Sequence, residues 1–332
     1  MWYDVFHDRG YAPDHETSAF DRIWVGTETR DYTDQQWGGT APYRGYWIMR
    51  WLGQIGGGKR GGGWYDQLGT HGDTYLEQAR QTILGGARES VLFSYPSLLR
   101  NTGPENIEAL RKEQPKLFEL AAWVKGETPR GVISYKPISS PGDDDAWIAD
   151  WLGMVGIPLV PAHRFPPSAS TAKSAPYVAF FPVQAAHDPK FADEAARYLA
   201  NGGRAIFTAH AVAAAKLAAG SKGVFILDTP KPELIPDLPA GQITALRRAA
   251  LDPLGMTLEG PTWVALYLFG ARKLALENFR DRPAEMRLIL PDAGRYRLVL
   301  TLGREGARVT AVGGALTISL PPRTLACLVK PA

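Results

Sequence analysis

The feature that most constrains the fold lies between Arg22 and Tyr95, where short apolar segments alternate with helical ones. Residues 22–26, 61–65 and 89–95 contain apolar and aromatic side chains and have the length of strands. Polar or glycine-rich connections separate them from the helical segments. Strands that alternate with helices at this spacing are typical of parallel βα units.

Three helices and one further strand complete this first unit. Residues 43–55 carry Tyr and Trp at helical spacing. A helix over 74–84 follows Asp73, whose carboxylate is expected to accept from the free amides of the first turn. The helix over 104–125 begins with a proline, which the first turn of a helix accommodates. The short aromatic start, residues 1–6, is predicted to be a strand.

The pattern changes twice more along the chain, and each change predicts a further unit. After residue 127 a second alternation of strands and helices predicts an open, doubly wound sheet. From residue 262 short segments of period two, separated by turns, predict a small all-β sandwich. The predicted fold class is α/β: a partial (β/α)₈ barrel over residues 1–127, an open doubly wound domain over 128–261 and an all-β module over 262–332. The strands expected in the last two units are 131–136, 157–161, 177–182, 204–208, 224–227, 273–279, 285–290, 296–302, 308–312, 315–319 and 325–329.

Two carboxylates follow strands of the predicted barrel. Glu28 comes after the strand 22–26, and Asp66 directly follows Tyr65. Barrel enzymes do their chemistry at the carboxyl ends of their strands, so both side chains are expected on that face. Arg30 is expected to keep Glu28 ionised. The alternative interpretation is a surface ion pair between Glu28 and Arg30, with Asp66 capping a loop.

A paired set of carboxyl groups with aromatic side chains around it is typical of a carbohydrate site. Trp37 stands in a polar loop and is the best candidate for stacking on a sugar ring, whereas Trp47 and Trp51, four residues apart on a helix, are expected in the core. The other residues expected to line the same face are Trp64, Tyr65, Arg30, His71, Asp4 and His7.

Composition excludes several other classes of function. The net charge of +3 gives no electrostatic case for nucleic acid or an anionic membrane. Cys327 is the only cysteine, and the histidines show no metal-ligand spacing, so no metal site and no cofactor are predicted. No apolar run is long enough to span a membrane. The start does not read as a signal peptide, but an upstream leader would be missed in a truncated chain, so the compartment stays open.

Three further motifs favour structural roles. The glycine run at 53–59 fits a phosphate loop by count, but a helix precedes it and a strand follows, which is the reverse of that motif. The second unit has no cysteine nucleophile, so amidotransferase chemistry is not expected there. Asp145 and its acidic neighbours are interpreted as a solvated helix start. Three histidines are expected in loop or core positions: His163, His187 and His210.

The order of barrel end, open α/β domain and β module resembles that of the family 42 β-galactosidases and related barrel glycosidases. Three stretches carry the resemblance: residues 70–95 look like the last helix and strand of such a barrel, 131–210 like the amidotransferase-related trimerisation domain, and 274–279 with 320–325 like the C-terminal β domain. The resemblance implies hydrolysis of a glycosidic bond, a carbohydrate substrate and assembly as a homotrimer through the α/β domain.

The chain departs from that family in two ways. In the family, a general acid/base Glu follows strand four and a nucleophilic Glu follows strand seven. Here the strand matching the seventh ends in Asp66, and Glu28 would end the sixth. Only four strands fit before Leu98, so the residue expected after strand four has no counterpart.

We therefore expect the C-terminal part of a glycoside hydrolase, weakly active or inactive by itself. The alternatives are a non-catalytic carbohydrate-binding or assembly protein that retains the scaffold, and a barrel whose missing half comes from another chain.

Overall fold

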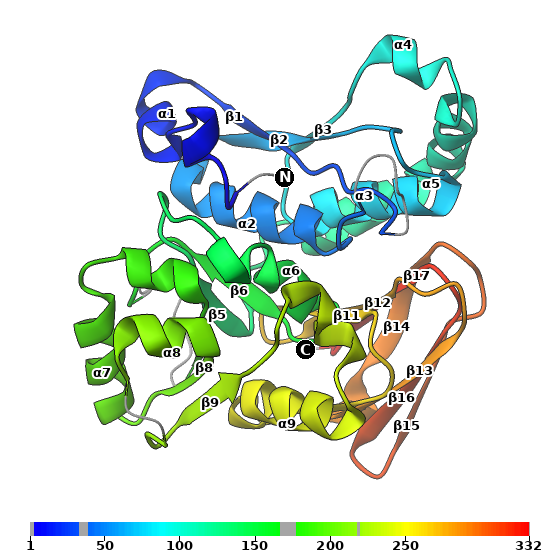
Figure 1. Ribbon diagram of the computed structural model, residues 1–332. Coiled ribbons are helices and arrows are strands. Elements are labelled where there is room, and N and C mark those ends of the chain that lie inside the picture. Colours follow the sequence, from blue (N-terminus) through cyan, green and yellow to red (C-terminus); the bar gives the residue numbers. More distant parts are fainter. Residues whose placement is uncertain (1–2, 33–38, 167–176, 218–219, 332) are drawn as a thin grey trace.

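The computed structural model describes residues 3–32, 39–166, 177–217 and 220–331. The predicted parallel βα alternation is present in the first part of the chain. Strands β1 (Ile23–Gly26), β2 (Arg60–Tyr65) and β3 (Glu89–Leu92) form a parallel sheet in that order. Helices α2 (Arg44–Gly56) and α3 (Gly72–Leu84) lie on one side of it (Figure 1). Within the described residues the sheet does not close, so the barrel is partial.

The predicted strand at the start of the chain is wrong for the residues that are described. Residues 3–6 form turns, followed by the short helix α1 (Pro13–Ala19). The ring of Tyr3 packs on Trp47, with the two ring centroids 4.2 Å apart. Large aromatic side chains are driven to bury their surface wherever a core is available, and here the core of α2 takes this one instead of a sheet.

Helix α2 is buried on both sides, between the β1–β3 sheet and the next sheet. Trp47 and Trp51 are in the core, as predicted, and their rings are stacked at 5.8 Å. The Trp47 Nε1 group donates to the Ser134 hydroxyl at 3.3 Å, and that of Trp51 to the Lys136 carbonyl at 3.0 Å. These bonds satisfy the indole donors that burial would otherwise leave unpaired.

The start of α3 differs from the prediction. His71, not Asp73, occupies the N-cap, and the Thr74 hydroxyl accepts from the His71 amide at 2.9 Å. Asp73 lies in the first turn and pairs with Arg304 at 3.1 Å. After α4 (Tyr95–Leu98), helix α5 (Gly103–Val124) carries a proline in its first turn, as predicted.

The second sheet is open and doubly wound, as predicted. Its five parallel strands run in the order β6-β5-β7-β8-β9, so the strand order reverses beside β5. The strands are β5 (Val132–Tyr135), β6 (Leu159–Ala162), β7 (Val178–Phe181), β8 (Arg204–Thr208) and β9 (Val224–Leu227), and the helices are α6 (Ile148–Gly153), α7 (Phe191–Ala200), α8 (Ala209–Ala215) and α9 (Ala240–Leu251).

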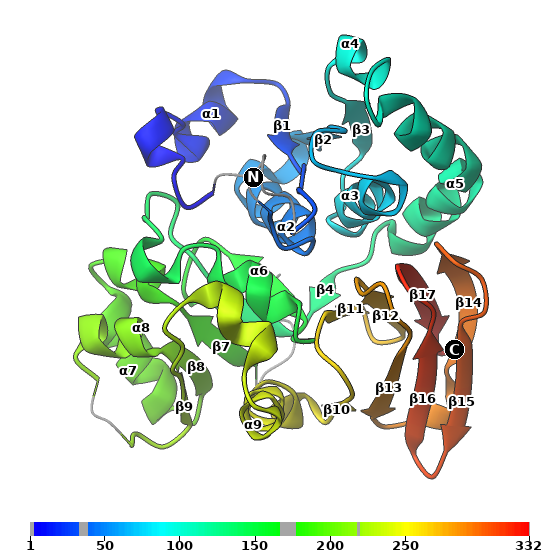
Figure 2. The ribbon, with the colours of Figure 1, turned by 45° about the vertical axis from the view of Figure 1, so that its right-hand side comes forward.

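The remaining strands form two antiparallel sheets, which Figure 2 shows beside α5. The orders are β10-β13-β16-β15 and β14-β17-β12-β11-β4. Their bounds are β4 (Pro129–Arg130), β10 (Thr257–Glu259), β11 (Val264–Phe269), β12 (Lys273–Asn278), β13 (Ala284–Ile289), β14 (Arg297–Leu302), β15 (Arg308–Val312), β16 (Ala315–Leu320) and β17 (Thr324–Val329). No helix in the described part of the chain has both the length and the apolar character that crossing a membrane requires.

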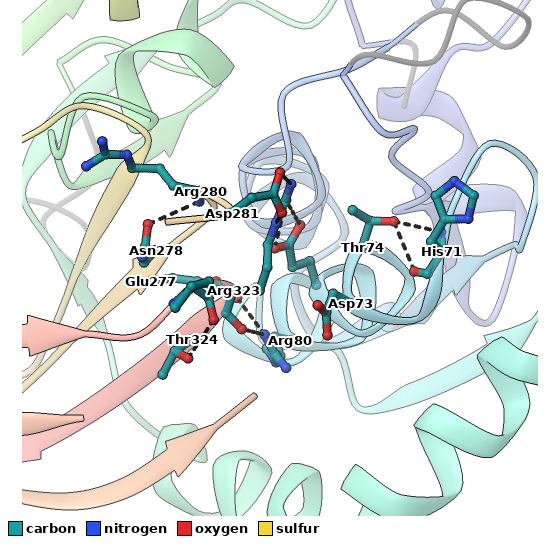
Figure 3. Close-up of polar contacts among 12 residues, drawn as sticks. His71, Asp73, Thr74, Arg80, Glu277, Asn278, Arg280, Asp281, Arg323 and Thr324 are labelled. Atoms are coloured by element: carbon teal, nitrogen blue, oxygen red, sulfur yellow. Dashed lines mark hydrogen bonds and ion pairs between the residues drawn. The ribbon is translucent and has the colours of Figure 1, made fainter. Parts of the chain in front are cut away.

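A buried charge network joins α3 to α5 and to the antiparallel sheets, and Figure 3 shows the part of it around Arg80, Glu277 and Arg323. The Arg80 guanidinium is fully buried and donates to both carboxylate oxygens of Glu113, at 2.7 and 2.8 Å. Its third nitrogen donates to the Arg323 carbonyl at 3.1 Å and lies 3.6 Å from Glu277. Arg323 in turn pairs with Asp281 at 2.8 Å. Glu77 also pairs with Arg323, at 3.3 Å, so two arginines face four carboxyl groups. Because Glu113 already neutralises Arg80, the Glu277 carboxyl group is one of the surplus acids of this network.

Replacing Glu277 by glutamine is expected to make stability less dependent on pH. Burial raises the pKa of Glu277 to about 8, although Arg80 opposes the rise. A carboxyl group whose pKa is higher in the folded state stabilises below the unfolded pKa of about 4.3, and that stability is lost as pH rises toward 8. Urea unfolding at pH 5 and pH 8 should therefore show a smaller loss of stability in E277Q. An equal loss in both proteins would contradict this assignment.

Candidate functional site

Glu28 is buried at the carboxyl end of β1. Successive side chains of a strand alternate between its faces, so Trp24 and Glu28 share one face. Both line a cavity of about 110 Å³, together with Phe6, Tyr11 and Trp64. Glu28 is 2% exposed, and its Oε2 atom finds no hydrogen-bond partner among the described residues. A buried carboxyl oxygen without a partner is costly, so this group is suited to meeting a ligand.

Gly26 makes room for this carboxyl group. A Cβ atom added at Gly26 would overlap the Glu28 carboxylate and would come within 2.8 Å of the Trp64 ring. The Glu28 side chain therefore folds back over the strand into space that only glycine leaves free. The cavity thus depends on the residue type at position 26 as well as on Glu28.

The electrostatics of Glu28 differ from the prediction. Burial raises the pKa of Glu28, and Asp66 adds to the rise, whereas Arg30 opposes it. The sequence predicted that Arg30 would keep Glu28 ionised; Arg30 does lower the pKa of Glu28, but burial outweighs it, and the guanidinium itself is paired with Asp66. The alternative of a surface ion pair also fails, since Glu28 and Arg30 are both buried.

Arg30 is paired instead with Asp66, across the gap between the two loops that follow β1 and β2. Two guanidinium nitrogens reach the two oxygens of the Asp66 carboxylate, at 3.0 and 3.2 Å. The Leu68 amide also donates to Asp66, at 3.0 Å, so this side chain caps its loop as well. Burial raises the pKa of Asp66, and the Arg30 charge limits the rise.

The other residues predicted for this face are divided by the pleat of β2. Trp64 lines the cavity, and its ring lies 4.9 Å from that of Phe93. Tyr65 points to the opposite side, where its ring packs at 5.4 Å against Tyr75 of α3. His71 is exposed at the start of α3, and Trp37 lies outside the described residues.

Asp4 and His7 do not line the cavity, which corrects the prediction for both. Asp4 is buried against the doubly wound sheet, where it pairs with Lys136 at 3.1 Å and accepts from the Trp147 amide at 2.7 Å. His7 lies in a short 3₁₀ helix beside Asp8, at 3.3 Å. Without the strand predicted over residues 1–6, nothing aims these two side chains at the carboxyl ends of β1 and β2.

Three aromatic residues of the cavity were missed by the sequence reasoning: Phe6, Tyr11 and Trp24. Trp24 carried a usable signal, because it stands four residues before Glu28 and therefore on the same side of an extended strand. Phe6 and Tyr11 carried none, since they reach the cavity from a segment of turns.

The acidic run in the doubly wound domain is not a solvated helix start at Asp145. That carboxylate is buried and accepts from the Thr208 hydroxyl at 2.5 Å, the Val183 amide at 2.6 Å and His210 Nδ1 at 2.8 Å. The hydrogen bond to Asp145 raises the pKa of His210. Cys327 is buried in β17, in the antiparallel part. In the described ranges no group of three or more His, Cys, Asp or Glu is arranged to hold a metal ion.

Comparison with known proteins relates the first part of the chain to glycosyl hydrolases. Residues 1–128 match the family model described as "Probable glycosyl hydrolase, catalytic domain". A family 42 exo-carrageenase from Bacteroides ovatus is similar over the whole chain, with a TM-score of 0.52 and 11% identity. A β-galactosidase from Bacillus circulans sp. alkalophilus is similar over 96% of the chain, with a TM-score of 0.54 and 11% identity. The predicted resemblance to the family 42 glycosidases is confirmed at the level of the fold.

The chain spans only part of these proteins. It covers 51% of the carrageenase chain and 61% of the β-galactosidase chain. An uncharacterized protein of Saccharolobus solfataricus is 29% identical over 178 residues, which is 50% of this chain and 28% of that protein.

Proposed function

We propose that the chain supplies part of the active site of a glycoside hydrolase, with Glu28 and Asp66 as its carboxyl groups. The observation that carries the proposal is the buried, unpartnered Glu28 carboxyl group in a cavity lined by Trp24 and Trp64. Tryptophan faces suit sugar rings, and a carboxyl group with a raised pKa suits protonation of a leaving oxygen. The catalytic-domain match over residues 1–128 supports the same reaction class.

Glu28 acts as the proton donor in this proposal, and Asp66 is the second carboxylate. A glycosidase needs one group to protonate the departing oxygen and another to attack the sugar or to activate water. The raised pKa of Glu28 keeps more of it protonated near neutrality than an exposed glutamate would be. The pair with Arg30 favours the ionised form of Asp66.

A barrel glycosidase uses more strands than the first sheet of the described residues contains. A complete barrel has eight strands, whereas the first sheet of the described residues has three. Unpaired sheet edges leave a substrate cleft open to water, and water weakens the electrostatic contribution of buried groups. We therefore expect the chain alone to be a slow catalyst.

A panel of aryl glycosides tests this function. Slow release of the aryl group from at least one sugar, by the purified 332-residue chain, is the expected result. The second candidate is a carbohydrate-binding protein without catalysis, which is favoured by the Asp66 carboxylate being tied to Arg30 through both oxygens. Sugar binding in calorimetry without any hydrolysis would support that candidate. Neither binding nor hydrolysis would overturn both.

A further inference from the structure

The loops that carry Glu28 and Asp66 separate and then meet again. The backbone ladder of β1 and β2 ends with the Thr27 amide donating to the Trp64 carbonyl at 2.8 Å. The two loops are bonded again where the Asp31 amide donates to the Gly69 carbonyl at 2.8 Å. Between these two bonds the loops lie further apart, and Glu28 and Asp66 belong to the separated segments.

The amide of Gln78 fills the gap in this ladder. After the bond from Thr27 to Trp64, a continued parallel pair would have the Asp66 amide donate to the Thr27 carbonyl and then the Thr29 amide donate to the Asp66 carbonyl. Instead, the Thr29 amide donates to Gln78 Oε1 at 3.2 Å, and Gln78 Nε2 donates to the Asp66 carbonyl at 2.9 Å. One side-chain amide, fully buried on α3, thus lies where a direct backbone bond would be.

Helix α3 holds this amide in place. Thr82 is one turn further along, on the same face, and its hydroxyl lies 2.6 Å from that of Thr27. The neighbouring Gln81 points the other way and donates to the Tyr267 hydroxyl at 2.8 Å in the antiparallel part. The helix is therefore anchored on both sides, which fixes the depth at which Gln78 enters the ladder.

We propose that Gln78 is a positioning residue that keeps the peptide groups following Glu28 and Asp66 a fixed distance apart. The separation of the two carboxyl groups decides whether a glycosidase inverts or retains configuration, so a spacer between their loops bears directly on the reaction. This inference rests on the proposed function for its catalytic meaning, but the spacing itself is measurable without substrate.

The test compares Q78M with Q81M in the full chain. Both remove side-chain hydrogen bonds from buried positions of α3, two in Q78M and three in Q81M, but only Q78M releases the site loops. We expect the Thr29 amide to exchange about tenfold faster in Q78M. We also expect the pKa of Glu28, followed by carbon NMR, to fall toward that of an exposed glutamate, since burial is what raises it. Q81M should change neither.

The outcomes separate the two proposals. A folded Q78M with the exchange rate and Glu28 titration of the wild type would overturn the positioning role. If the expected changes occur and no sugar is bound or cleaved by the wild type, the positioning role stands and the proposed function fails. If Q78M does not fold, Q78E replaces it: its neutral carboxyl group can make both bonds at low pH, and ionisation removes the donor. Amide exchange quickens with pH in any protein, so the wild type is the reference: Thr29 exchange that rises with pH no more steeply in Q78E than in the wild type would also overturn the role.

Discussion

Replacing Arg80 by methionine is expected to lower the free energy of unfolding by about 3–5 kcal/mol. Methionine fills a similar volume, so the main loss is charge and hydrogen bonding. The substitution leaves the Glu113 carboxylate half of a broken pair and removes the donor to the Arg323 carbonyl. Removing one partner of a buried ion pair is costly because the other charge stays buried without a counter-charge. The intact pair, by contrast, adds little stability compared with an apolar core of the same volume. Urea denaturation followed by circular dichroism measures the change.

The matched control is R111M on α5. Arg111 also pairs with a glutamate through two nitrogens, at 2.9 and 3.0 Å from Glu108, but both side chains are exposed. Solvent screens such a pair, so R111M is expected to leave the unfolding midpoint unchanged. If R80M lowered stability no more than R111M, the Arg80 network would not be what secures α3 to the antiparallel sheets.

Local pattern predicted most of the fold, and its failures have physical causes. Period two revealed β13 and β16, because only one face of each is buried and the other meets water. β11 was missed because all six of its residues are buried, so it carries no alternation. The predicted strand at residues 1–6 is wrong for a different reason. Its aromatic residues fit a strand composition, but tertiary packing on α2 claimed Tyr3.

The site was predictable where it follows from the strands and unpredictable where it depends on long-range partners. The positions of Glu28 and Asp66 at strand ends follow from parallel pairing alone. Alternation along a strand places Trp64 and Tyr65 on opposite faces, and this was visible in the sequence. Which of the two faces the cavity depends on the strand register, which was not. Arg30 pairs with Asp66 rather than with Glu28 because of where two loops meet in space. Arg30 and Asp66 are 36 residues apart in the sequence. No local pattern carries that information.

Glu28→Gln is expected to reduce kcat/KM on the best aryl glycoside by about 10²- to 10⁴-fold, the range that a positioned acid or base contributes. Glutamine keeps the shape and occupies the same space over Gly26, but it cannot deliver a proton. The pH profile sharpens the test. A proton donor with a raised pKa is active while it is protonated, so the wild-type rate should fall as pH rises through the pKa of Glu28.

Glu89→Gln provides the control for this prediction, because Glu89 belongs to the same sheet but stands at the start of β3, paired with Arg22 on the surface. It should leave both the rate and the pH profile unchanged. If E28Q cleaved the aryl glycoside as fast as E89Q, the activity would arise elsewhere in the chain and Glu28 would be a buried structural acid. If E28Q lost the rate but the wild-type rate did not fall at high pH, Glu28 would act as the attacking carboxylate, since that role requires the ionised form.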